Sequence, residues 1–97
     1  MSVVLHATWT VTPGREHIVR EALASLAPAT REEPGCLFFQ PYVDPAEPNV
    51  IRIFEVYLDQ DAVTAHAESA HFAQWALGVA IPELIDRRRE FFETLDV

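Results

Sequence analysis

The hydrophobic residues of the chain form segments with two different periodicities. Residues 3–11 are rich in β-branched and aromatic side chains, and they predict a first strand. Between residues 18 and 26 the apolar side chains recur at helical spacing with charged residues among them, which predicts an amphipathic helix. The apolar segments 36–43 and 50–58 follow, and they predict the second and third strands.

Capping and helix-breaking residues set the expected boundaries of the helices. Thr12 is expected to cap the first helix, with Pro13 at its first position, and Pro28 is expected to limit it. Asp59 is expected to cap a second helix and Ser69 a third, so that this region forms two short helices with a break between them.

The C-terminal segment 89–97 fits two patterns. Its apolar residues suit a helix if Phe91, Phe92 and Leu95 are taken together, and a strand if the alternation of Phe91, Leu95 and Val97 is followed. If the segment is a strand, the order of elements is β-α-β-β-α-β.

The predicted strands are apolar on both faces, which is the most informative feature of the pattern. In the third strand, one face carries Ile51, Ile53 and Tyr57 and the other carries Val50, Phe54, Val56 and Leu58. An antiparallel sheet with helices on one side normally leaves a polar face to water. Covering several hundred Å² of apolar surface contributes on the order of 10 kcal/mol before the entropy costs of association. We therefore expect a homodimer formed through the sheet face.

Composition narrows the class of protein. The 97 residues predict one domain, 1–97, and 49% of them are hydrophobic, a normal globular fraction. Seven basic and fifteen acidic residues give a net charge of −8, which argues against a nucleic-acid partner. No apolar run is long enough for a membrane span and no signal peptide is recognisable, so we expect a cytoplasmic protein without a membrane partner. The single cysteine, Cys36, agrees with a reducing compartment.

Four short motifs in this order resemble the antibiotic biosynthesis monooxygenase family, a branch of the dimeric α+β barrel proteins. They span nearly the whole chain, at Val11–Gly14, Arg31–Leu37, Phe54–Tyr57 and Ala65–Phe72. The resemblance implies an α+β, ferredoxin-like subunit with a four-stranded antiparallel sheet and helices on one face. It also implies a pocket between sheet and helices, dimerisation through the sheet, and a strand for the C-terminal segment.

The resemblance implies a small-molecule enzyme but leaves its reaction open, because members of the family include monooxygenases of phenols and quinols, haem-degrading enzymes and an enzyme of autoinducer catabolism. The haem-degrading members need an Asn, a Trp and an axial His where this chain has Ala7, His66 and Ala76. No glycine-rich nucleotide or flavin loop is present either. We therefore expect no cofactor, so that an oxygenase of this sequence would take its electrons from the substrate.

His66 is the first candidate for a catalytic residue, because the resemblance places a pocket histidine at this position and an imidazole accepts a proton near neutral pH. A hydrogen-bonded structural histidine is the alternative. Four aromatic residues are expected to form an apolar slot for a planar substrate, although each taken singly fits a plain core role. They are Trp9, Phe54, Phe72 and Trp75.

Other polar residues are expected to have structural roles. His71 lies five residues from His66 across a helix break, which is not the spacing of two metal ligands on one helix face, so we expect no metal. Glu55 and Arg52 lie inside an apolar strand and need partners, either across a dimer interface or on a substrate. The cluster 87–89 of three arginines is expected to be a solvated segment.

Three functions remain open at the level of sequence. The first is a cofactor-independent monooxygenase that oxidises a small phenol or quinol with O₂, with His66 as the base. The second is a cofactor-free isomerase that shuttles a proton on a small carbonyl compound. The third is a non-enzymatic dimer that binds a small molecule.

Overall fold

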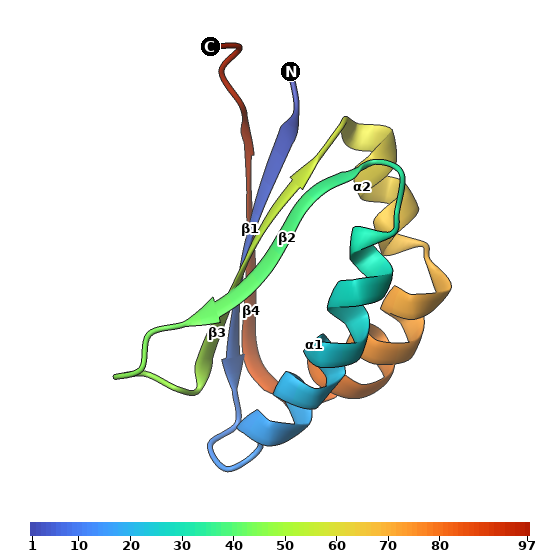
Figure 1. Ribbon diagram of the computed structural model, residues 1–97. Helices are drawn as coiled ribbons and strands as arrows, with labels where there is room; N and C mark the ends of the chain where they lie inside the picture. Colours follow the sequence, from blue (N-terminus) through green and yellow to red (C-terminus); the bar gives the residue numbers. More distant parts are fainter.

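All helices lie on one face of a single four-stranded sheet in the computed structural model, which describes residues 1–97 (Figure 1). The strands are antiparallel to their neighbours, in the order β2-β3-β1-β4. This arrangement confirms the predicted α+β, ferredoxin-like class. The elements along the chain are β1 (Val3–Val11), α1 (Glu16–Arg31), β2 (Cys36–Val43), β3 (Val50–Tyr57), α2 (Gln60–Ala67), the π-helix η1 (Phe72–Ala80), the short 3₁₀ helix η2 (Ile81–Glu83) and β4 (Leu84–Glu93).

The first helix begins later than the sequence predicts. Thr12 and Pro13 were expected at its start, but α1 begins at Glu16 and its N-cap is Arg15. The cause is Gly14, whose φ of 91° lies in the left-handed region, where a helix cannot propagate. Residues 12–14 therefore form a turn, which the Glu16 carboxylate supports by accepting a hydrogen bond from the Gly14 N–H at 2.7 Å.

The same helix also ends later than predicted, because Pro28 lies inside α1 and does not limit it. A proline in a helix interior costs about 3 kcal/mol. Contacts of the last turn offset this cost: Ala27 and Thr30 are buried, and the Arg31 guanidinium donates to the carbonyl oxygen of Phe39 at 2.8 and 3.0 Å. Packing against the sheet thus outweighs the local preference.

The two predicted caps in the second helical region are confirmed. The Asp59 carboxylate accepts a hydrogen bond from the Ala62 N–H at 2.8 Å, at the start of α2. The Ser69 hydroxyl oxygen accepts from the Phe72 N–H at 3.2 Å, at the start of the next helical segment. That segment is mostly a π-helix, a rare form that occurs often at functional sites.

The last strand settles the ambiguity of the C-terminal segment. β4 pairs with β1 and runs from Leu84 to Glu93, so it begins earlier than the segment 89–97 and ends within it. The arginine cluster 87–89 lies inside this strand, opposite Ala7, Thr8 and Trp9, and all three arginines are exposed, as expected for a solvated segment.

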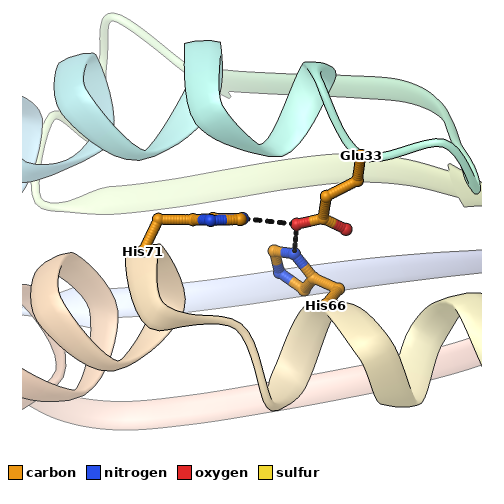
Figure 2. Close-up of side chains that lie close together, drawn as sticks. All are labelled: Glu33, His66 and His71. Carbon is orange, nitrogen blue, oxygen red and sulfur yellow. Dashed lines mark hydrogen bonds and ion pairs between the residues drawn. The ribbon is translucent and has the colours of Figure 1, made fainter.

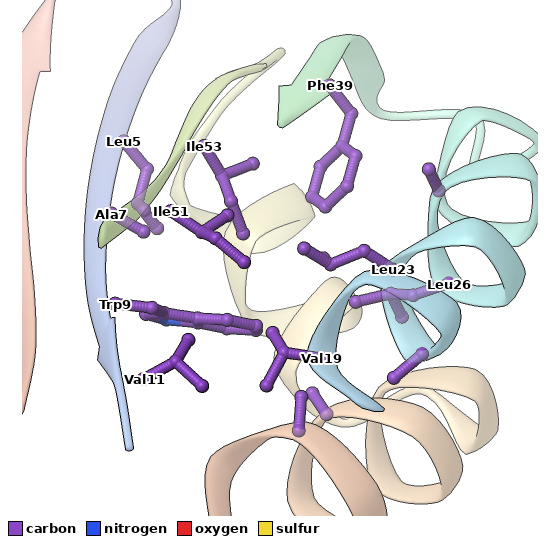
Figure 3. Close-up of a cluster of buried hydrophobic side chains, with 14 of the residues drawn as sticks. Leu5, Ala7, Trp9, Val11, Val19, Leu23, Leu26, Phe39, Ile51 and Ile53 are labelled. Carbon is purple, nitrogen blue, oxygen red and sulfur yellow. The ribbon is translucent and has the colours of Figure 1, made fainter. Parts of the chain in front are cut away.

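The hydrophobic core fills the space between the helices and one face of the sheet, as Figure 3 shows. β1 supplies every second residue to it, namely Leu5, Ala7, Trp9 and Val11. α1 supplies the opposing layer, which includes Val19, Leu23 and Leu26. None of the helices combines the length and the apolar composition that crossing a bilayer requires.

The opposite face of the sheet has no helix over it (Figure 1). Several large apolar side chains lie on this face. We call it the outer face. Strand register places four exposed aromatic residues there, and the Phe38 and Phe54 rings make an edge-to-face contact with centroids 5.7 Å apart. The four are 39–55% exposed: Phe38, Tyr42, Phe54 and Phe92.

Candidate active site

A small cavity lies between the helix-facing side of the sheet and the helices. Its volume is about 40 Å³, enough for a few water molecules, so an aromatic ring enters only if lining side chains move. Most of the lining is apolar, and the polar groups in it are few. The lining residues are Leu5, Ala7, Trp9, Leu26, Phe39, Ile53, Glu55, Val63, His66, Ala67, Phe72, Arg87 and Arg89.

His66 comes from the last turn of α2, three residues after Val63, and both side chains are buried on the face of the helix that meets the sheet. Its Nδ1 lies 2.8 Å from Oε2 of Glu33, which belongs to the turn after α1 (Figure 2). A carboxylate only accepts hydrogen bonds, so Nδ1 carries the proton and Nε2 keeps its free electron pair. Burial lowers the pKa of His66, against the opposing effect of Glu33, so the imidazole is neutral at pH 7.

Glu33 also binds His71, the residue that precedes η1. Nε2 of His71 lies 2.5 Å from the same Oε2 atom that contacts His66, and Figure 2 shows the carboxylate between the two rings. One atom from each of Glu33, His66 and His71 is of a kind that can bind a metal ion, and these three atoms lie within 4.8 Å of one another. The ligand atoms of a tetrahedral Zn²⁺ lie roughly 3.3 Å apart, given bonds of about 2 Å. Separations of 2.8 and 2.5 Å are hydrogen-bond lengths, so the geometry is that of a hydrogen-bonded cluster.

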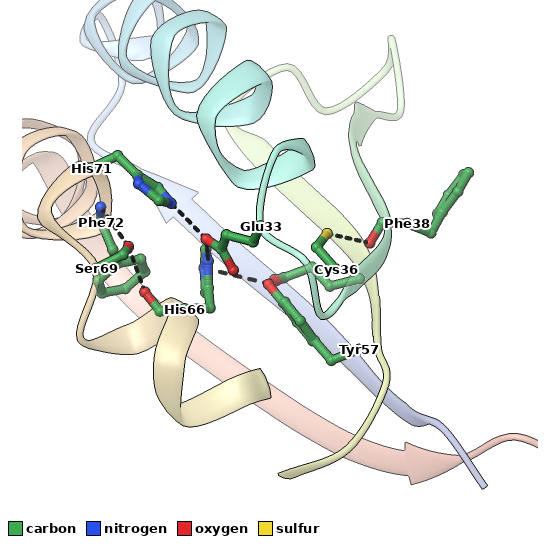
Figure 4. A network of polar contacts seen from close by, with 9 residues as sticks. Glu33, Cys36, Phe38, Tyr57, His66, Ser69, His71 and Phe72 are labelled. Carbon is green, nitrogen blue, oxygen red and sulfur yellow. Dashed lines mark hydrogen bonds and ion pairs between the residues drawn. The ribbon is translucent and has the colours of Figure 1, made fainter. Parts of the chain in front are cut away.

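Glu55 is a buried carboxyl group that reaches the cavity from β3. It is 4% exposed, and it accepts a hydrogen bond of 2.5 Å from the Tyr57 hydroxyl group. Figure 4 shows Tyr57 in the network of polar contacts that includes Glu33 and His66. Burial raises the pKa of Glu55 to about 7, although Tyr57 and the two arginines of the cavity lower it. Oε1 of Glu55 lies 3.9 Å from Nε2 of His66. The cavity therefore contains a neutral imidazole that can accept a proton beside a carboxyl group whose pKa is about 7.

Glu55→Gln is expected to change the pH dependence of stability. The pKa of Glu55 is about 7 in the folded state against an ordinary value of 4.5, so between these pH values the folded state binds more protons than the unfolded state. The free energy of unfolding therefore falls as pH rises through this window, by about 3 kcal/mol for a shift of this size. The lowered pKa of His66 acts in the opposite direction, because its stability contribution grows as pH rises.

Urea unfolding of the wild type and Glu55→Gln at pH 5 and pH 8 isolates the contribution of Glu55, since His66 is common to both proteins. The variant is expected to gain about 3 kcal/mol relative to the wild type between the two pH values. Parallel pH profiles of the two proteins would contradict the assignment of a raised pKa to Glu55.

Two arginines of β4 complete the polar lining. Register pairs Arg87 with Trp9 and Arg89 with Ala7, which places both on the helix-facing side of the sheet, whereas Arg88 lies on the outer face. Burial and the charge of Arg89 lower the pKa of Arg87, against the effect of Glu55. The guanidinium groups stay charged at neutral pH.

The structure brings together some of the residues that the sequence singled out, and separates others. His66, Trp9 and Phe72 line one cavity, and the His66 and Phe72 rings are in edge-to-face contact with centroids 5.1 Å apart. Phe54 was expected in the same wall, but it is paired with His6 and lies on the outer face, so that placement was wrong. Trp75, on η1, is partly buried and packs against the core. It does not line the cavity.

Five polar residues of the site were missed or given another role. Glu55 was assigned a structural role, although it alternates with Ile51, Ile53 and Tyr57 and so shares their buried face. That alternation is the signal that could have found it. No comparable local signal exists for the others, because they meet only through long-range contacts. The five are Glu33, Glu55, His71, Arg87 and Arg89.

Gly35 sets the distance between the Glu33 turn and α2. A Cβ atom at this position would overlap the Cβ of Ala62 in α2. Gly35→Ala is therefore expected to destabilise the fold by about 1–3 kcal/mol, the cost of overpacking, and to displace Glu33 from His66. The double variant Gly35→Ala/Ala62→Gly removes the overlap and is expected to recover most of the loss beyond the roughly 1 kcal/mol that glycine costs in a helix. Strict additivity of the two changes in denaturant unfolding would contradict this packing.

Solved structures with the same fold are numerous. An antibiotic biosynthesis monooxygenase matches with a TM-score of 0.89 at 22% identity, over 96% of this chain and 98% of the other. Rv0793 from Mycobacterium tuberculosis has a TM-score of 0.89 and 22% identity, over 100% of this chain and 98% of the other. PA3566 from Pseudomonas aeruginosa has a TM-score of 0.85 and 23% identity, over 97% of this chain and 94% of the other. At these identities the likeness shows the fold alone.

Sequence comparison supplies the family. No curated protein sequence matches the chain. The family model described as antibiotic biosynthesis monooxygenase matches residues 2–76, and this range includes β1, β3, Glu33, Glu55, His66 and His71. Because the match extends over more than half of the residues, the chain belongs to the antibiotic biosynthesis monooxygenase family.

Proposed function

We propose that the protein is a cofactor-independent monooxygenase that oxidises a small phenolic or quinol-type aromatic compound with O₂. The observation that supports this best is the protonation and orientation of the His66 imidazole. Its Nδ1 is held by Glu33, and its Nε2 is unprotonated and lies in a mostly apolar cavity. This is the arrangement of a general base whose tautomer and orientation are fixed by a carboxylate.

In the proposed reaction, Nε2 of His66 removes the acidic proton of the substrate. The resulting electron-rich anion transfers an electron to O₂, and the two radicals combine into a carbon-bound peroxide. The ring carbon that carries the peroxide then loses its hydrogen as a proton, the O–O bond breaks and water leaves, so that a carbonyl group remains. For phenol the balance is C₆H₅OH + O₂ → C₆H₄O₂ + H₂O, in which the substrate supplies all four electrons.

The lining of the cavity supports this chemistry. Trp9 and Phe72 provide aromatic surfaces for a planar ring, and exclusion of water raises the energy of the substrate anion, which makes it a stronger electron donor. Glu55 lies 3.9 Å from Nε2 of His66 and can take up the proton that the base has removed. The substrate itself must open the 40 Å³ cavity, and the exposed side chains of Arg87 and Arg89 are free to move outward.

Oxygen uptake with a panel of quinols and phenols tests the proposal. The expected result is enzyme-dependent uptake of one O₂ per substrate, with ¹⁸O from ¹⁸O₂ in the organic product and no release of hydrogen peroxide. Hydrogen peroxide in stoichiometric amounts would mean oxidase chemistry, and absence of uptake with every enolisable aromatic tested would contradict the proposal.

A cofactor-free isomerase is the second candidate, and the pairing of Glu55 with His66 favours it. A neutral imidazole and a carboxyl group with a pKa of about 7, which lie 3.9 Å apart, can remove a proton from one carbon and return it to another. Such a reaction consumes no oxygen. Turnover of a small carbonyl compound at the same rate under argon and air would establish the isomerase and exclude the monooxygenase.

We also propose that the outer face is covered by a second copy of the chain. It presents the exposed aromatic side chains Phe38, Tyr42, Phe54 and Phe92, while the helices cover only the other side of the sheet. An apolar patch of this kind is unusual on a monomer. A second copy presents the same patch, and a two-fold axis through the face makes it self-complementary.

A further inference from the structure

Two cationic side chains in the cavity lining form no ion pair with a carboxylate. Arg87 and Arg89 both face the cavity, yet neither takes part in any ion pair of the structure. The chain as a whole has a net charge of −8, so two adjacent positive charges are not part of a generally basic surface. The repulsion between the two guanidinium groups is unfavourable. An anion bound between them would attract both and offset this repulsion.

A third unpaired donor belongs to a residue of the neighbouring strand that lines the same cavity. Trp9 is 2% exposed and lines the cavity, and its Nε1–H has no hydrogen-bond partner. A buried donor without an acceptor costs about 1–3 kcal/mol, and native structures rarely contain one without a reason. Trp9 and Arg87 are direct cross-strand neighbours, so the unpaired indole N–H and a guanidinium group arise from adjacent positions of the sheet.

We propose that the cavity selects an aromatic substrate that carries a carboxylate, which Arg87, Arg89 and the Trp9 N–H bind while the ring faces His66. The inference rests on the proposed function, because it concerns the same cavity. It adds the chemical class of the substrate. The hydroxyl oxygen of a neutral phenol accepts at most two hydrogen bonds and has no charge to offset the two cations. A carboxylate has two oxygens and a full negative charge, and it matches a pair of guanidinium groups.

A structural role of the arginines is the competing explanation. Both lie close enough to Glu55 to lower its pKa, so they could simply compensate a buried carboxylate. This explanation predicts that their replacement alters the titration of Glu55 and leaves the preference between charged and neutral ligands unchanged. Ligand pairs of equal shape and different charge therefore separate the two explanations.

The test compares binding of 2,5-dihydroxybenzoate with binding of 2,5-dihydroxybenzamide, a neutral compound of nearly the same size. Isothermal titration calorimetry under argon measures affinity without turnover. The wild type is expected to bind the benzoate about ten- to hundredfold more tightly than the benzamide, the range for charge-assisted hydrogen bonds. Arg87→Gln and Arg89→Gln are each expected to remove most of this preference and to leave the affinity for the benzamide within about twofold.

Arg88→Gln is the matched control, because it removes the same charge from the same strand on the outer face. It is expected to retain the preference for the benzoate, and thermal unfolding and sedimentation velocity confirm that each variant is folded and has the oligomeric state of the wild type. Equal affinity of the wild type for both compounds, no binding of either, or an equal loss in Arg88→Gln would overturn the inference. Preferential benzoate binding without oxygen uptake would leave it standing and reject the monooxygenase proposal alone.

Discussion

His66→Gln is expected to lower the rate of oxygen uptake by about 10²- to 10⁴-fold, the range for loss of a positioned general base. Glutamine is close to histidine in size and can still donate to Glu33 from its amide, but it has no basic nitrogen to aim into the cavity. The rate should fall through kcat, with a smaller change in KM, because the base acts in the transition state. Stopped-flow oxygen consumption with a quinol substrate provides the measurement.

Two further variants establish whether the loss is chemical. Glu33→Gln keeps the shape of the side chain but removes the charge that orients His66, so a smaller loss of kcat is expected. His17→Gln changes an exposed histidine on α1 outside the cavity and should leave the rate unchanged. If His66→Gln melts like the wild type and keeps its rate, His66 is not the base.

Phe54→Glu is expected to dissociate the proposed dimer. Phe54 lies on the outer face in edge-to-face contact with Phe38, and its side chain is 39% exposed in the single chain. Loss of an apolar contact of about 2 kcal/mol occurs twice across a two-fold axis, which raises the dissociation constant by roughly 10³-fold before charge repulsion is added. Sedimentation velocity at micromolar concentration should show a dimer for the wild type and a monomer for the variant.

Leu77→Glu provides the matched control, because Leu77 is 51% exposed but lies on η1, on the helix-covered side of the sheet. It is expected to remain dimeric. A wild type that sediments as a monomer at these concentrations would reject the dimer, and dissociation in both variants would place the interface elsewhere.

The fold could be predicted from the sequence because its strands and helices differ in hydrophobic period. Alternation in β3 correctly separated Ile51, Ile53 and Tyr57 from Val50, Phe54 and Val56. It did not reveal which of the two sets meets the helices, since both faces are apolar. Phe54 was placed in the pocket for this reason, and only the tertiary structure shows that the helices cover the opposite side.

The site was less predictable than the fold, because its polar contacts join distant parts of the chain. Glu33 and His66 are 33 residues apart, and no periodicity relates them. The place of the arginines in the cavity lining was missed for another reason. All three are exposed, as the sequence predicts, but successive side chains in a strand point to opposite faces, so Arg87 and Arg89 also line the cavity while Arg88 does not.

The two ends of the described chain meet beside each other at one end of the sheet. The Ser2 N–H donates to the Thr94 hydroxyl oxygen at 3.0 Å, and the Thr94 N–H donates to the Ser2 carbonyl oxygen at 3.0 Å. The two ends of the described chain are therefore close enough to be joined by a short linker. The exposed turn at 44–48 between β2 and β3 is a suitable site for new termini. A circular permutant that starts at β3 would connect the same elements in a different order and still bring Glu33, His66 and Arg87 to one cavity. The arrangement of the cavity residues therefore depends on how the strands and helices pack and not on the order in which the chain connects them.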